Sequence, residues 1–240
     1  ITATSIMPIK RSKRYKKALE LLGAPKARTL TNAVDVLIKF PKAKFNETVD
    51  LAFKLGVDPR QSDQMVRGTV PLPHGSGKVV RVLVFAKSGD AADAARAAGA
   101  EFVGFDDMIK KCQEGWSDFD VAIATPEAMS EVRKLGKVLG PRGLMPNPKT
   151  GTVTDDTAKA VREVKAGRVE FKVDKAGNVH VPVGKVAFSA QQIEENAKSV
   201  IEAVIKAKPA AVRGVYVQRV TISTTMSPPV QLDLRDLKAQ

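Results

Sequence analysis

The chain has 240 residues, of which 39 are Lys or Arg and 26 are Asp or Glu, so its formal net charge is +13. This length can bury one or two hydrophobic cores, and no apolar run approaches the roughly 20 residues of a membrane-spanning helix. The single cysteine, Cys112, excludes an internal disulfide framework, and we expect it to be a packing residue in a cytoplasmic protein.

The positive charge is concentrated at the two ends of the chain. Residues 1–75 hold 14 Lys or Arg against 6 Asp or Glu, and residues 168–240 hold 11 against 7. The middle, residues 76–167, is nearly balanced, with 14 against 13. Concentrated positive charge suits a polyanion such as nucleic acid, whereas a balanced surface suits a soluble body.

The first third of the chain predicts two helices followed by two strands. Apolar residues recur at helical spacing in residues 14–22, and Thr31 is the expected N-cap of a second helix. Residues 45–57 then alternate between apolar and polar, which predicts a half-buried antiparallel strand. A shorter strand is expected at residues 66–72.

Strands and helices alternate in the middle of the chain. Residues 79–86 form an almost unbroken apolar run, typical of a strand covered on both faces. Further strands are expected at residues 101–104 and 119–124. Such alternation predicts a parallel sheet with right-handed crossovers. The expected helices cover residues 91–98 and 106–114, and a third starts at Thr125-Pro126.

Residues 136–153 predict a loop of defined shape. They include four glycines and three prolines but keep apolar residues for burial. Proline fixes φ and lacks a backbone donor, so neither a helix nor a central strand can run through this stretch. Its basic residues are Lys137, Arg142 and Lys149.

The pattern of an antiparallel sheet returns after residue 167. Residues 169–173 and 179–183 alternate on either side of a turn. Ser189 and Gln192 form a capping box for the helix that follows, and residues 215–225 predict a last strand. The helix is expected to bury Ile193, Ala197, Val200, Ile201, Val204 and Ile205.

The two ends of the chain therefore predict one α+β domain, an antiparallel sheet with helices, formed by residues 1–75 and 168–240. We expect an α/β domain of Rossmann-like, three-layer type to be inserted at residues 76–167. Gly75-Ser-Gly77 and Gly167 bracket this insertion, and they are either hinges or ordinary turn glycines.

The residues give little support to catalysis. Phosphate binding needs a Gly-rich turn that leads from a strand into a helix N-terminus. Lys87-Ser-Gly-Asp90 has one glycine and an acid, and Gly75-Ser-Gly-Lys78 precedes a strand. Two histidines and one cysteine are too few for an all-His/Cys zinc site, and no set of nucleophile, base and orienting group is recognisable. We expect no enzyme, no cofactor and no small-molecule substrate.

Nucleic acid is the partner that the residues favour. Residues 10–17 hold six positive charges, which can neutralise several phosphates and make affinity depend on salt. Because aromatic residues make up only 5% of the chain, recognition is expected to rest on backbone charge and the shape of a folded RNA. The expected basic contacts are Lys10, Arg11, Lys13, Arg14, Lys44, Arg168, Lys172 and Lys175.

One motif resembles a known family. The run Leu139-Gly-Pro-Arg-Gly-Leu-Met-Pro-Asn-Pro-Lys149 closely resembles the signature of the ribosomal L-one family, the rRNA-binding stalk proteins of the large subunit, in its bacterial type. The resemblance extends over residues 10–228. It implies an RNA-contacting patch at the family's Ala-Lys-Phe-x-Glu-Thr and Thr-Thr-Met-Gly-Pro motifs, where Ser227 replaces the usual glycine. The residues of this patch would be Phe45, Thr48, Thr224, Thr225, Met226 and Ser227.

The same resemblance implies further contacts and a function. Arg168, Lys172, Asp174 and Lys175 would lie beside the patch, and the loop with Arg142 and Lys149 would contact messenger or transfer RNA more weakly. The implied protein is a structural constituent of the large ribosomal subunit in the cytoplasm. Its large-subunit rRNA complex would form the mobile stalk near the tRNA exit site.

Two further partners follow from the resemblance, and two alternatives remain open. The stalk would assist release of deacylated tRNA from the exit site, and the protein would repress translation of its own mRNA. The alternatives are a non-ribosomal RNA-binding protein that uses the same fold and a nucleotide-dependent enzyme.

Overall fold

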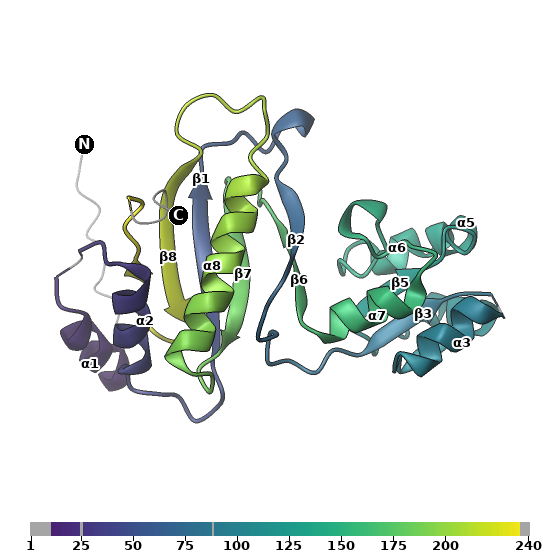
Figure 1. Ribbon diagram of the computed structural model, residues 1–240, viewed down its shortest axis with the longest axis horizontal. Helices are drawn as coiled ribbons and strands as arrows, with labels where there is room; N and C mark the ends of the chain where they lie inside the picture. The colour runs from purple at the N-terminus through teal and green to yellow at the C-terminus, as the bar shows by residue number, and fades with distance from the viewer. Residues whose placement is uncertain (1–10, 25, 88, 236–240) are drawn as a thin grey trace.

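The computed structural model describes residues 11–24, 26–87 and 89–235, so the expected contact Lys10 lies outside the described residues. The chain forms both antiparallel and parallel sheets together with helices, which confirms a mixed α+β protein. In Figure 1 the large antiparallel sheet and the parallel sheet lie toward opposite ends of the molecule.

Strands from both ends of the sequence form the antiparallel sheet. β1 (Thr48–Leu55) pairs with β7 (Asn178–Lys185) on one side and with β8 (Val217–Thr224) on the other, and β9 (Val230–Gln231) extends the sheet beyond β8. The early and late segments of the chain are therefore neighbours, as the sequence predicts. The sequence did not predict β9, because a strand of two residues shows no alternation.

Helices cover one face of this sheet. α8 (Ala190–Lys206) lies over the sheet in Figure 1 and runs nearly along its strands, with α2 (Leu30–Ile38) packed against α8 and β8. Alternate residues of β1, from Val49 to Leu55, are buried against these helices, and the residues between them are partly or fully exposed. The predicted capping box of α8 is present. α1 (Lys13–Leu22) precedes α2 and buries Ala18.

Two expectations about these helices were wrong. The N-cap of α2 is Thr29, whose hydroxyl accepts the Asn32 N–H at 3.4 Å. The Thr31 side chain instead donates to Glu194 Oε1 at 3.1 Å, because the helix has already begun. Ile205 was expected in the core but is 41% exposed, since it lies at the edge of the buried stripe of α8.

The parallel sheet has the order β4-β3-β5. β3 (Val82–Phe85) lies between β4 (Phe102–Gly104) and β5 (Val121–Ala124). Successive residues of β3 enter two different hydrophobic clusters: Val84 packs with residues of α3 (Asp90–Ala97) and α7 (Thr157–Lys165), whereas Phe85 packs with residues of α4 (Asp106–Gln113) and of the helices after β5. Both faces of this sheet are therefore buried.

The middle segment departs from the sequence predictions at two places. β3 begins at Val82, and Val79 is 87% exposed, because residues 79–81 lie before the paired part of the strand. After Thr125-Pro126 the chain makes a turn before α5 (Met129–Val132) begins. The remaining short helices are η1 (Ser62–Gln64), η2 (Arg133–Leu135), α6 (Gly136–Leu139) and η3 (Pro148–Thr150).

A two-stranded ribbon connects the two sheets. β2 (Arg67–Pro71) pairs with β6 (Arg168–Lys172), and the ribbon lies between the sheets in Figure 1. The backbones cross at Gly75 and Gly167, where a Cβ added to Gly167 would lie 2.4 Å from Gly75 Cα. Gly167 is thus required for a close approach of the backbones, and Gly75 for a positive φ of +70°. Whether the two glycines also act as hinges stays a prediction.

Candidate nucleic-acid interface

A buried carboxylate, that of Glu47, joins three segments at one end of the antiparallel sheet. Its Oε1 accepts hydrogen bonds from Arg14 Nη1 at 3.2 Å and from Ala43 N at 2.8 Å. Its Oε2 accepts from Thr224 Oγ1 at 2.7 Å and from Met226 N at 3.0 Å. Because Glu47 is only 3% exposed, these bonds fix α1, the segment before β1 and the turn after β8 to one another.

The surroundings of Glu47 keep its side chain charged. Burial opposes the charge, but the hydrogen bonds from Thr224, Ala43 and Met226 and the positive charge of Arg14 outweigh it, so the pKa of Glu47 lies below its ordinary value of 4.5. The Arg14 guanidinium is 27% exposed and also donates to the Met226 carbonyl at 3.3 Å. Arg14 therefore contacts both Glu47, before β1, and Met226, in the turn after β8.

Two threonines from distant strands meet beside this carboxylate. The Thr225 N–H donates to the Thr48 carbonyl at 3.1 Å, and the Thr48 N–H donates to Thr225 Oγ1 at 3.1 Å. Lys185 Nζ donates to Thr48 Oγ1 at 2.7 Å, which adds a cation at the end of β7. The result is a row formed by Lys185 of β7, Thr48 of β1 and Thr225 directly after β8, with charge and hydroxyl groups suited to phosphate and ribose.

Large apolar side chains are exposed at the same place. Phe45 is 54% exposed and Met226 is 50% exposed, although both flank strands whose inward residues are buried. An exposed aromatic ring next to hydroxyl and basic groups suits contact with an unstacked base. Phe45 is therefore accessible for the RNA contact that the family resemblance implies, and that contact stays a prediction.

Ser227 takes the place of the glycine that the family motif has. Its Oγ accepts the Thr224 N–H at 3.0 Å, and its own N–H donates to the Thr224 carbonyl at 3.2 Å. Among the described residues only glycines have positive φ, so Ser227 adopts an ordinary backbone conformation. The turn therefore accepts a side chain here without strain, and the hydroxyl closes it.

The basic residues of α1 border the patch. Ser12 caps the helix by accepting the Tyr15 N–H at 3.2 Å, and the Arg11 guanidinium lies 5.1 Å from the centre of the Tyr15 ring. Lys13 is exposed, as is Lys44 in the segment before β1. These cations are available to phosphates at the end of the sheet where Glu47 lies.

The structure corrects the expected position of the turn that carries Asp174 and Lys175. This turn follows β6 and leads into β7 next to Lys54, whereas the Thr48 end of β1 lies six residues away, roughly 20 Å along the strand. The turn is therefore at the opposite end of the sheet and not beside the patch. Asp174 shapes it by accepting the Ala176 N–H at 2.8 Å and the Asn178 N–H at 2.7 Å.

Arg168 and Lys172 lie on the ribbon and not beside the patch. Arg168 donates to Glu163 Oε2 at 2.7 Å and to Thr69 Oγ1 at 2.9 Å, so it links α7 to β2. Lys172 is exposed at the far end of β6, opposite Arg67. The patch and these residues were predicted as one surface because sequence order does not reveal that β6 pairs with β2 and leaves the large sheet.

The weaker predicted contacts lie near the parallel sheet. Arg142 is exposed in the loop after α6 and donates to the Ser117 hydroxyl. The side chain of Lys149 lies outside what the structure describes, although its backbone belongs to η3. Neither residue is near Glu47 in the sequence, and neither belongs to a strand of the antiparallel sheet. An RNA contact at Arg142 or Lys149 would therefore be separate from the surface around Glu47.

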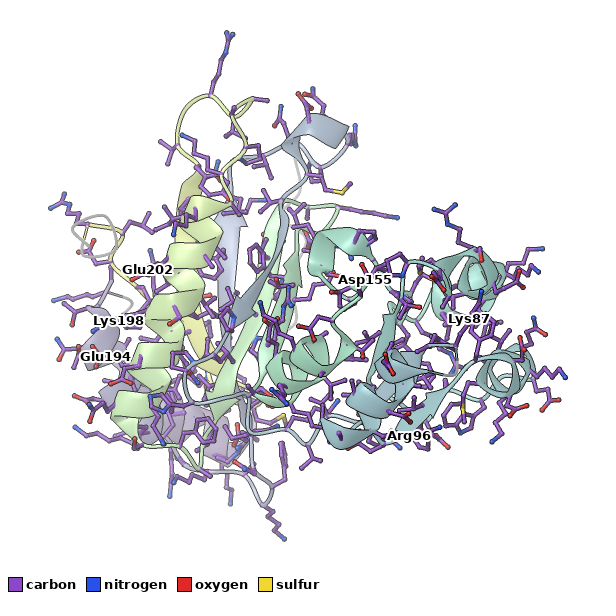
Figure 2. All side chains as sticks on the ribbon, turned by 45° about the vertical axis from the view of Figure 1, so that its right-hand side comes forward. Lys87, Arg96, Asp155, Glu194, Lys198 and Glu202 are labelled. Atoms are coloured by element: carbon purple, nitrogen blue, oxygen red, sulfur yellow. The ribbon has the colours of Figure 1, made fainter. Side chains whose placement is uncertain are left out.

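The outer face of α8 contrasts with the patch. Figure 2 shows Glu194, Lys198 and Glu202 side by side along the helix, pointing away from the sheet. Glu194 and Lys198 form an ion pair of 2.9 Å. These three residues have no excess of positive charge, so this stretch of α8 is a poor surface for a polyanion.

Sequence reasoning missed Glu47 and Lys185. Glu47 is part of the Ala-Lys-Phe-Asn-Glu-Thr segment that was recognised, but a glutamate before an alternating strand is usually solvent-exposed. A signal was available, because Glu47 occupies a defined position of that motif. Lys185 has no local signal, since its place next to Thr48 depends on how β7 pairs with β1.

The hollow at the carboxyl ends of β3 and β4 has a volume of about 660 Å³. Lys87 and Arg96 line it, and Figure 2 shows both in this part of the molecule. Three carboxylates line it as well: Asp93, Asp106 and Asp107. Asp106 and Asp107 lie in the first turn of α4, the part of a helix that would otherwise bind a phosphate.

Within residues 11–24, 26–87 and 89–235, no cluster of His, Cys, Asp and Glu could hold a metal ion. Cys112 is buried, and burial raises the pKa of its thiol. His74 pairs with Glu195 at 2.5 Å on the surface. No helix in the described part of the chain is long and apolar enough to cross a membrane.

A mixed α+β fold with a basic, hydroxyl-rich surface at one end of an open sheet defines a protein of the RNA-binding class. The sequence model of the ribosomal protein L1p/L10e family matches residues 37–228, and the chain belongs to this family. It is a family of structural proteins of the large ribosomal subunit in the cytoplasm that bind rRNA, and not a family of enzymes.

Proposed function

We propose that this protein holds large-subunit rRNA on the surface organised by Glu47. The observation that carries the proposal is the set of four hydrogen bonds to one buried carboxylate. These bonds bring together Arg14 of α1, residues 43–48 before and at the start of β1, and residues 224–227 at the end of β8. Phosphates would contact the basic residues, riboses the threonine row, and unstacked bases Phe45 and Met226. The proposed contacts are Arg11, Lys13, Arg14, Lys44, Phe45, Thr48, Thr224, Thr225, Met226 and Ser227.

The rRNA would continue along the open face of the sheet to the turn with Asp174 and Lys175. In β1 the side chains that alternate with the buried ones lie on this face, and so do their partners in β7 and β8. A single polar face thus joins the Thr48 end of the sheet to the end that carries the turn with Asp174 and Lys175. Lys172 would contact the RNA beyond the turn, and Arg168 would act from the ribbon.

We further propose a division of the chain into two domains. Residues 1–75 and 168–240 would form the rRNA-binding domain, and residues 76–167 a Rossmann-like domain that projects from it. Three separate hydrophobic clusters support this division, because one belongs to the antiparallel sheet and two flank the parallel sheet. The projecting domain would form the mobile stalk and assist release of deacylated tRNA from the exit site, with Arg142 and Lys149 as its contacts.

Repression of the protein's own mRNA would use the same patch. An mRNA that presents the fold of the rRNA site would occupy the Glu47 surface and compete with rRNA. A competition assay between the rRNA fragment and the mRNA leader tests this: mutual displacement supports it, and simultaneous binding contradicts it.

Replacing Phe45 with alanine is expected to weaken rRNA binding by about 1–3 kcal/mol, the loss of one base–aromatic contact. The free energy of unfolding should change by less than about 0.5 kcal/mol, because the ring is largely in solvent. Filter binding and urea unfolding measure the two quantities. Val215→Ala, at an apolar residue 64% exposed near the Leu55 end of β1, is the control. Equal rRNA affinity for Phe45→Ala and wild type would remove Phe45 from the interface.

Neutralising Lys13 and Lys16 together by glutamine is expected to flatten the dependence of log affinity on log salt by roughly 2 units. Both side chains are exposed on α1, so folding should be unaffected. The matched control is Lys110→Gln with Lys111→Gln, which removes the same charge from exposed positions of α4. If both double variants change the slope equally, the effect is one of net charge and not of contact.

A further inference from the structure

The open face of the antiparallel sheet contains a hollow of about 610 Å³. Ala52 of β1 forms its floor, with His180 of β7 and Thr221 of β8 directly opposite on either side. The short Ala side chain between two larger neighbours creates the depression. A volume of this size falls in the range of small-molecule sites, which is sufficient for one nucleotide.

The next row toward the end of the sheet has an unusual arrangement of charge. Lys54 and Arg219 are directly opposite on β1 and β8, and like charges at such positions destabilise a sheet. Among the described residues neither forms an ion pair with a carboxylate. Lys54 donates a hydrogen bond to the Ala176 carbonyl at 2.5 Å. An anion bound between the two cations would offset their repulsion.

The other side of the hollow has different chemistry. The row beyond Ala52 contains Asp50 and Ser223, directly opposite on β1 and β8. Asp50 is partly buried and would repel a phosphate, but a carboxylate and a hydroxyl can both bind ribose hydroxyls. Asp50 and Ser223 lie outside the lining of the hollow itself, which has cations at the Lys54 end and the Thr221 hydroxyl beside Ala52.

The hollow is continuous with the proposed interface. The row of Lys185 and Thr48 lies two residues beyond Asp50 on the same face of β1. Each two-residue step along a strand is about 6.6 Å, so an RNA strand on the Thr48 row would have its neighbouring nucleotides over this face. This continuity favours RNA over an acidic peptide as the occupant.

We propose that the hollow over Ala52 is a subsite for one unpaired nucleotide of the bound RNA. Its phosphate lies between Lys54 and Arg219, its base stacks against the His180 ring, and its ribose faces Thr221. The subsite rests on the proposed function, since it receives a nucleotide of the same RNA that the Glu47 surface holds. It adds a contact that reads an unpaired position and not only backbone charge.

The test combines a protein variant with a modified RNA. Ala52→Leu fills the hollow without changing charge, and Ala97→Leu, at an exposed alanine of α3, is the matched control. The probe is an rRNA fragment that wild-type protein binds, in which each unpaired nucleotide in turn is made abasic. Circular dichroism and thermal unfolding show whether Ala52→Leu is folded.

The proposal expects one abasic position to weaken wild-type binding about tenfold, the size of one lost base contact. Ala52→Leu should lose about tenfold on intact RNA, lose nothing further at that position, and keep the wild-type salt slope. If every abasic position weakens Ala52→Leu as much as wild type, or if folded Ala52→Leu binds intact RNA normally, the subsite is overturned. If Ala52→Leu does not fold, the variant Arg219→Gln tests the subsite in its place.

Arg219→Gln should lower affinity and reduce the salt slope by about 1, whereas Arg133→Gln, at an exposed arginine of η2, should do neither. A salt slope unchanged in Arg219→Gln overturns the phosphate contact.

Binding of a free mononucleotide is a further test. If the mononucleotide binds wild type saturably but does not bind Ala52→Leu, the hollow is a site for free nucleotide and the RNA subsite is wrong. If Phe45→Ala weakens rRNA binding while Ala52→Leu does not, the interface stands and only the subsite fails.

Discussion

Replacing Glu47 with alanine is expected to lower the free energy of unfolding by roughly 2–4 kcal/mol. The variant leaves the Thr224 hydroxyl and the N–H groups of Ala43 and Met226 without their acceptor, and Arg14 without its counter-charge. Buried polar groups that lose their partners cost far more than exposed ones. Urea unfolding measures the loss, and rRNA affinity should fall with it because Phe45 and Met226 are no longer held together.

A control separates burial from charge. Glu131→Ala removes a carboxylate whose side chain is 42% exposed and pairs with Lys134, so it should change stability by less than about 1 kcal/mol. A loss for Glu47→Ala no larger than that of the control would show that the carboxylate does not organise the site.

The same carboxylate makes stability depend on pH. The folded pKa of Glu47 lies below 4.5 because its hydrogen bonds and Arg14 outweigh the cost of burial. Its contribution is therefore fully present above the unfolded pKa and is lost as the pH falls through the folded pKa. The difference in unfolding free energy between wild type and Glu47→Gln should be largest near pH 7 and should shrink below about pH 4. A difference that stays constant across this window would contradict the assignment.

Replacing Gly167 with alanine is expected to be at least as damaging, with a loss of roughly 3 kcal/mol or more in unfolding free energy. Its φ of +101° is one that L side chains rarely adopt, and the added Cβ would lie 2.4 Å from Gly75 Cα and 2.7 Å from Ser76 N. Backbone atoms cannot move aside as a flexible side chain can. The two crossing segments would have to separate.

Gly143→Ala is the matched control for this variant. Gly143 also has a positive φ, +71°, but an added Cβ meets nothing within 4 Å. It should therefore cost only the conformational strain, about 1–2 kcal/mol. Thermal and urea unfolding of the two variants isolate the cost of the close approach, and equal losses would mean that Gly75 and Gly167 are not in contact in solution.

Features that depend on neighbouring residues were predictable. The alternation in β1, the capping box of α8 and the apolar run of β3 reflect interactions within a few residues, so the sequence places these elements. The exact first and last residues of helices and the edges of their buried faces were harder to predict from the sequence. Thr29 and Thr31 are both suitable N-caps, and the choice depends on where α2 packs. Ile205 shows the same limit, because its exposure depends on the edge of the buried stripe.

The candidate site was predicted in part. The motifs around Phe45 and Met226 identified segments that the structure brings to one end of the sheet. The turn with Asp174 and Lys175 was placed beside them, but it lies at the other end, because β7 runs antiparallel to β1 and starts opposite Lys54. Register between strands far apart in sequence is not encoded in either strand alone.

By itself the sequence determined the types and order of most elements, the basic character of the two ends, and the family to which the chain belongs. Only the tertiary structure decided that Glu47 would be buried among Arg14, Thr224 and Met226, and that Lys54 would face Arg219. The physical reason is range. Propensities and caps act over one or two turns, whereas these contacts join residues more than thirty positions apart and exist only once sheet pairing and core burial have fixed the register.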